Sequence, residues 1–190
     1  MIDTTFSTTE YSLLKNTVSH KLDAIISSAS DEWSRIYGNL CLKFDNFSLE
    51  LNNEEISIPF YDAHEDLALF KLRKLTPSQP FHPLVINTPL ENKSIYEIIE
   101  EIIIVEDEIH TTNSLTEPLY DIKTVTAIIF KTPKQYITLG REWFFSELIT
   151  LSQSNTYMDK LYPISKVIED WTDEESDIIA NCKRTFHKLK

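Results

Sequence analysis

Glycine is nearly absent from this chain. Only Gly38 and Gly140 occur among 190 residues, whereas ordinary usage of ~7% would give about thirteen. Phosphate-binding loops, dinucleotide fingerprints and nucleophile elbows each need two or more closely spaced glycines, because the backbone there must approach a ligand or adopt a positive φ. The sequence therefore excludes the commonest nucleotide-binding and α/β-hydrolase motifs.

Cysteines and long apolar runs are also scarce. Cys41 and Cys182 lie far apart and lack the spacing of a zinc or redox motif, so we expect reduced thiols without a disulfide. The longest clean aliphatic runs, such as residues 102–105, are far below the ~18 residues of a membrane span. The amino terminus lacks a signal-peptide pattern. We expect a soluble, cytoplasmic protein with no cofactor.

The net charge of −12 comes from two short stretches. Residues 91–121 hold nine acids and one base, and residues 169–177 hold six acids and no base, which leaves the rest of the chain close to neutral. Concentrated negative charge speeds encounter with a basic partner and repels nucleic acid and anionic membranes. We therefore predict a basic protein partner, with neither nucleic acid nor a membrane as ligand.

A helix followed by strands is predicted for the first part of the chain. Ser7-Thr8-Thr9-Glu10 has the spacing of a capping box, and the apolar residues after it recur at helical spacing, which predicts a helix over residues 9–29. From Leu40 onward the apolar residues alternate, as in antiparallel strands. The predicted strands are 40–44, 47–51, 56–60 and 67–74, with a tight turn or a bulge at 45–46 and a turn at 52–53.

The middle of the chain is predicted to be a loop followed by further strands. Four prolines forbid regular structure over residues 76–89, which we assign to a loop within the domain. The isoleucine-rich residues 94–110 fit either a helix or a strand, and we favour a strand ending near His110. A hairpin of residues 125–131 and 136–139 and a strand at 148–151 complete this part.

The carboxy-terminal residues 173–189 favour a helix. Their apolar residues share one helical face, with acids first and bases last, as the helix dipole prefers; a final strand is the rival interpretation. Together these elements predict one α+β domain over residues 1–190, with a mainly antiparallel β-sheet of about 6–8 strands, an N-terminal helix and a C-terminal helix.

Acids and aromatic residues supply the candidate docking residues. The stretch 169–177 has no histidine, cysteine or glycine and the stretch 91–121 has only His110, so neither shows the pattern that usually accompanies acidic metal or phosphate sites. Three consecutive aromatics on an extended backbone point to alternating faces, so one or two of them should be exposed, where they would form a hot spot for a basic partner. The predicted partner-binding residues are Glu106, Asp107, Glu108, Asp173, Glu174, Glu175, Asp177, Trp143, Phe144 and Phe145.

No catalytic residues are predicted. His64-Glu65 comes closest to a zinc-protease pair, but Ala68 stands where the second histidine should fall. The alternative of a metal-dependent hydrolase would rest on Asp62, His64 and Glu65 as ligands. A third hypothesis is an assembly subunit that uses its strands and aromatic segment as a symmetric interface.

The function predicted first is that of a non-enzymatic acidic binding protein. In general character, a small, acidic, glycine-poor α+β chain without catalytic motifs resembles the bacterial immunity proteins that neutralise basic nuclease toxins. The resemblance lies in size, charge, glycine content and fold class, and it includes no shared sequence motif. It implies a basic toxin or nuclease as the partner.

Overall fold

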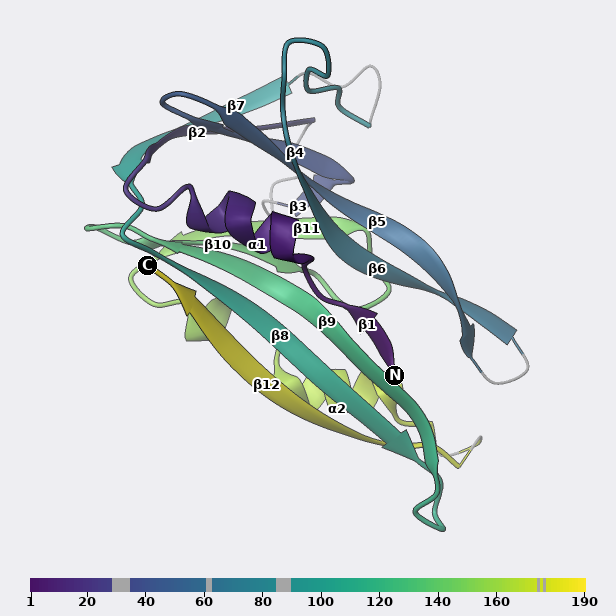
Figure 1. Ribbon diagram of the computed structural model, residues 1–190. Coiled ribbons are helices and arrows are strands. Elements are labelled where there is room, and N and C mark those ends of the chain that lie inside the picture. The colour runs from purple at the N-terminus through teal and green to yellow at the C-terminus, as the bar shows by residue number, and fades with distance from the viewer. Residues whose placement is uncertain (29–34, 61–62, 85–89, 174, 176) are drawn as a thin grey trace.

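Two antiparallel sheets make up most of the chain in the computed structural model (Figure 1). The structure describes residues 1–28, 35–60, 63–84, 90–173, 175 and 177–190. Its elements are β1 (Ile2–Thr4), α1 (Thr8–Lys15), β2 (Lys21–Ser28), β3 (Arg35–Tyr37), β4 (Asn39–Phe44), β5 (Ser48–Phe60), β6 (Ala63–Lys74), β7 (Leu90–Ile98), β8 (Glu101–Thr112), β9 (Pro118–Lys131), β10 (Tyr136–Arg141), β11 (Leu148–Ser154), a 3-10 turn (Met158–Lys160), α2 (Ile164–Trp171) and β12 (Ile179–Leu189).

The strands divide into a seven-stranded sheet and a five-stranded sheet. Sheet A has the order β12-β8-β9-β10-β11-β3, with β1 added in parallel to β9. Sheet B has the order β6-β5-β4-β2-β7. The predicted antiparallel α+β character and N-terminal helix are confirmed, but the described residues form twelve strands in two sheets, more than the sequence predicted.

The sheets lie face to face, with α1 between them and α2 on the outer side of sheet A (Figure 1). The main core joins Leu40, Leu42 and Leu51 of sheet B to Ile102 and Ile104 of sheet A. The outer face of sheet A is buried as well, because residues 155–171 cover it. Its side chains Ile103, Val105 and Ile129 pack with Leu161. Burial on both faces explains the unbroken aliphatic run in β8.

Helix α1 begins as predicted but ends earlier. Ser7 and Glu10 form the expected capping box. The helix stops at Lys15, and Ser19 adopts a positive φ of 70° in the turn that follows. The prediction of a helix to residue 29 is wrong, because residues 21–28 form β2 between β4 and β7. Ladder hydrogen bonds to two neighbouring strands outweigh the helical spacing of the apolar side chains.

Other strand predictions hold in part. The turn at 45–46, the hairpin of β9 and β10 and the strand β11 are confirmed. Strand is also right for most of residues 94–110, but this segment comprises the end of β7 in sheet B and most of β8 in sheet A. The turn predicted at 52–53 is wrong, since Asn53 lies inside β5 and its amide group donates to the carbonyl of Ser146. Residues 75–84 form a loop as expected, and 85–89 lie outside the described residues.

The tail is a strand, so the predicted C-terminal helix is wrong and its rival is right. β12 pairs with β8 along its whole length. The helix near this end is α2, which the sequence did not predict. Neither helix within the described ranges is long and apolar enough to cross a membrane.

Candidate functional site: the carboxylates of strand β8 and the acidic turns

Strand β8 buries two of its three consecutive acids. Glu106 is 2% exposed and Asp107 is fully buried, whereas Glu108 is partly exposed. The register between β8 and β9 shifts at Val105/Glu106. Successive side chains on a strand point to opposite faces, so Glu106 faces α1 and Asp107 faces the α2 side. The two carboxylates thus enter different environments.

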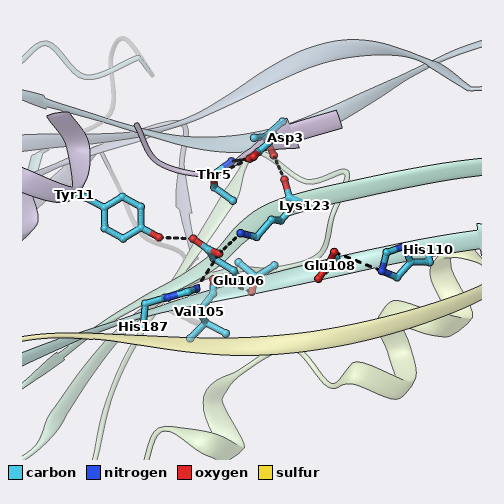
Figure 2. Close-up of polar contacts among 11 residues, drawn as sticks. Asp3, Thr5, Tyr11, Val105, Glu106, Glu108, His110, Lys123 and His187 are labelled. Atoms are coloured by element: carbon cyan, nitrogen blue, oxygen red, sulfur yellow. Dashed lines mark hydrogen bonds and ion pairs between the residues drawn. The ribbon is translucent and has the colours of Figure 1, made fainter. Parts of the chain in front are cut away.

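Glu106 is the centre of a network contributed by four elements (Figure 2). The hydroxyl of Tyr11 on α1 donates a short hydrogen bond to its Oε1. Its Oε2 lies 3.0 Å from Nζ of Lys123 on β9 and 3.0 Å from Nε2 of His187 on β12. Both oxygens of the carboxylate are therefore occupied by donors of the chain itself.

The pKa shifts in this network oppose acid–base chemistry at neutral pH. Burial alone raises the pKa of the Glu106 carboxyl, but hydrogen bonds from Tyr11 and Lys123 outweigh it and hold that pKa below its ordinary value. Burial and the bond to Glu106 raise the pKa of Tyr11, and the same carboxylate raises the pKa of Lys123. A general base works best with a pKa near the operating pH. The network therefore acts as a structural cluster of ion pairs and hydrogen bonds that holds α1, β9 and β12 against β8.

Asp107 is bound just as completely on the other face. Nε and Nη2 of Arg184 on β12 donate to its two oxygens, each over 2.6 Å. Nη1 of the same arginine donates to the carbonyl of Tyr162, just before α2, over 2.8 Å. This bidentate pair, buried at both ends, fixes the segment before α2 to sheet A.

The remaining acids of residues 91–121 are largely paired with bases from later in the chain. His110 lies 2.7 Å from Asp121 and 3.6 Å from Glu108. The charge that the sequence concentrates in this stretch is therefore largely paired within the fold, and we keep only its exposed members as docking candidates. Its other ion pairs are Glu97–Lys134, Glu100–Lys131, Glu101–Lys188 and Glu101–Lys190.

Asp173, Glu175 and Asp177 lie instead on an exposed turn. The backbone amide and hydroxyl of Ser114 donate to the Asp177 carboxylate over 3.1 and 2.9 Å, which ties this turn to the loop between β8 and β9. We name residues 113–117 together with the described residues of 172–179 (172, 173, 175 and 177–179) the clasp. Asp173, Glu175 and Asp177 are exposed, and Glu174 lies outside the described residues.

Two apolar side chains of the clasp are also open to solvent. Leu115 is 75% exposed and Ile179 is 53% exposed. Among the described residues, no lysine, arginine or histidine forms an ion pair with Glu117, Glu175 or Asp177. The clasp therefore combines exposed aliphatic surface with uncompensated negative charge.

The aromatic segment is a turn that divides its three rings between surface and core. Trp143 is 42% exposed, Phe144 is 2% exposed and Phe145 is intermediate. The rings contact one another in sequence: the ring centres of Trp143 and Phe145 lie 5.4 Å apart, and those of Phe145 and Trp171 lie 5.1 Å apart. The backbone amide of Ala68 on β6 donates to the carbonyl of Phe144, which fixes the turn against sheet B.

Arg141, at the end of β10, supports this turn from inside. It is 3% exposed, and its guanidinium lies 5.4 Å from the centre of the Phe70 ring and 5.9 Å from that of Phe144. It donates to the Thr124 hydroxyl and the Val125 carbonyl. Burial lowers its pKa to about 9.

The metal ligands considered from the sequence cannot be assembled from what the structure describes. His64 is exposed on β6, while Asp62 and the side chain of Glu65 lie outside the described residues. No group of three His, Cys, Asp or Glu side chains suited to a metal occurs within the described part of the chain.

Sequence reasoning missed the residues that engage β8. Tyr11, Lys123, Arg184 and His187 carried no motif, and their roles depend on strand pairing. Treating the tail as a strand would have placed its bases opposite acids, since Arg184 is the register partner of Asp107. Neither family models, nor curated proteins, nor solved structures show a significant match to this chain.

Proposed function

We propose that this chain is a non-enzymatic binding protein that docks a basic protein partner through the clasp. The observation that carries the proposal is the exposure of Leu115 and Ile179 near Glu117, Glu175 and Asp177, for which the described part of the chain shows no ion pair. Binding hot spots combine a central apolar anchor with a polar rim. Uncompensated charge at that rim speeds encounter with a partner of opposite sign.

The way the clasp is held also supports docking. Asp177 accepts two hydrogen bonds from Ser114, and the backbone of Asp173 pairs with that of Ile178 through two hydrogen bonds. A surface already ordered before binding loses less conformational entropy when a partner arrives. Trp143 lies on the same side of the molecule as α2, because its ring reaches Trp171 through Phe145. It is a second anchor for a large partner.

The partner class that best fits this surface is a basic toxin or nuclease, with the chain as its immunity-type inhibitor in the reducing cytoplasm. Cys41 and Cys182 are both free thiols, as that compartment favours. An inhibitor of this kind needs no catalytic group. The pKa of Glu106 is lowered and that of Tyr11 is raised, so both lie further from neutral pH, which disfavours acid–base catalysis.

The test is a titration of the chain with purified basic nuclease-toxin domains at several salt concentrations. A triple variant, Glu117→Lys with Asp173→Lys and Glu175→Lys, should abolish binding, and Leu115→Asp should weaken it by tenfold or more. The matched control is Glu54→Lys with Glu55→Lys, two exposed acids on β5 outside the clasp. Binding that survives the triple variant, or that the control weakens equally, would refute docking through the clasp.

A further inference from the structure

A small pocket opens where the end of α1 meets sheet B. It has a volume of about 70 Å³ and is lined by Leu13 and Asn16 from the helix end and by Phe47, Leu49 and Lys74 from the sheet. A cavity of ~150 Å³ accepts benzene. This pocket is therefore of a size for a chain of a few carbon atoms whose polar end stays at the opening.

The floor of the pocket is apolar and held in place. Leu49 is fully buried. The ring of Phe47 stacks on Phe44 at 4.9 Å and meets the edge of His20 at 5.2 Å. Leu13 packs against the main core. These contacts form a preformed wall for an aliphatic group.

The rim of the pocket carries donors without partners. Nζ of Lys74 lies 5.7 Å from the centre of the Phe47 ring, and no carboxylate of the described residues pairs with it. The Asn16 side chain, which also lines the pocket, makes no hydrogen bond within the described ranges.

The nearby groups that might compete for these donors are already engaged. The carboxylate of Asp45 lies 2.9 Å from Nδ1 of His20. The last carbonyls of α1 are also satisfied, because Ser12 accepts from the amide of Asn16 and Leu14 accepts from the amide and hydroxyl of Thr17. Lys74 at the rim thus remains available to an anion.

We propose that this pocket binds a short aliphatic carboxylate, whose hydrocarbon part contacts Leu13, Phe47 and Leu49 while its carboxylate accepts from Lys74 and Asn16. The shared chemistry is a carboxylate on three to five carbons, supplied either by a free monocarboxylic acid or by the C-terminal residue of a peptide. None of the clasp residues takes part, so this site is independent of the proposed function. A ligand this small binds with a Kd on the order of 1 mM.

The test is a titration of the full chain with butyrate, followed by amide chemical shifts. Saturable shifts should centre on the pocket residues, and butyramide, which has the same shape without the charge, should bind roughly tenfold or more weakly. Lys74→Met should weaken butyrate binding by a similar factor. Lys71→Met is the matched control, since Lys71 is exposed on the same strand but, three residues away, faces the opposite side.

N-acetylvaline separates the two sources of the carboxylate. Tighter binding of N-acetylvaline than of butyrate assigns the pocket to a peptide C terminus, and the reverse assigns it to a free acid; both depend on Lys74. Equal binding of butyrate and butyramide, unchanged binding by Lys74→Met, or no saturable shift up to ~50 mM butyrate would overturn the proposal. Lys74 is exposed, so a folded variant is expected, and its thermal midpoint verifies this.

Discussion

Removing a single hydroxyl from α1 should measurably destabilise this protein. In Tyr11→Phe, Oε1 of Glu106 loses the donor that now reaches it. The Glu106 side chain is 3% exposed, so bulk water cannot easily replace that donor. A hydrogen bond to a charged group contributes ~1.5–3 kcal/mol. For a chain of this length the loss corresponds to a fall in Tm of roughly 3–12 °C.

The cost of Tyr11→Phe should also depend on pH in a defined way. The pKa of Glu106 is lowered in the folded state, so its stabilisation is present above the ordinary glutamate pKa and is lost as pH falls through the folded value. The pKa of Tyr11 is raised, so its stabilisation is present below the ordinary tyrosine pKa and is lost as pH rises toward the folded value. The difference between wild type and variant should be flat near neutrality and shrink at both extremes.

Urea unfolding at a series of pH values measures this difference. Tyr96→Phe is the control, because Tyr96 is 66% exposed and its ring contact with Lys21 survives loss of the hydroxyl. A double-mutant cycle with Glu106→Gln isolates the coupling between the two side chains. A cost below ~0.5 kcal/mol for Tyr11→Phe, or the same cost in the Glu106→Gln background, would refute the role of this bond.

Three further outcomes test the fold. Arg184→Ala leaves the buried Asp107 carboxylate without its partner and should lower the free energy of unfolding, measured by chemical denaturation, by ~3–5 kcal/mol. In the control Lys183→Ala, which changes an exposed neighbour, the free energy of unfolding should differ from that of wild type by less than ~0.5 kcal/mol. Gly38→Ala forces a side chain into a φ of 74° and should cost ~1–2 kcal/mol in the same assay; an unchanged midpoint would contradict the backbone conformation. Thermal unfolding should be insensitive to dithiothreitol, because both cysteines are free, and a lower Tm under reduction would reveal a disulfide.

Local signals in the sequence predicted the elements that depend on neighbours in the chain. The capping box at Ser7 and Glu10 requires only four consecutive residues, and it is present as predicted. The hairpin of β9 and β10 turns at residues 132–135, which proline and its neighbours favour. Both signals act over a few residues, so a single sequence contains all the information they need.

The four-residue spacing of apolar side chains explains why the helix predicted for residues 173–189 is wrong. Ile178, Cys182 and Phe186 share a helical face, because four residues make about one turn, but an even spacing also places them on one face of a strand. The pattern therefore favours neither structure. Pairing with β8 decides the outcome, and that partner lies about seventy residues earlier, beyond the reach of any local rule.

The same long-range pairing explains why charge along the sequence differs from charge in the fold. Antiparallel register brings Arg184 opposite Asp107, and it brings Lys123 opposite Glu108, two residues from Glu106. Acids on a central strand therefore meet bases from the strands on either side. Asp173, Glu175 and Asp177 precede β12, which begins at Ile179, and they lie outside the described strands. We therefore propose docking through the acids of the clasp rather than through those of β8.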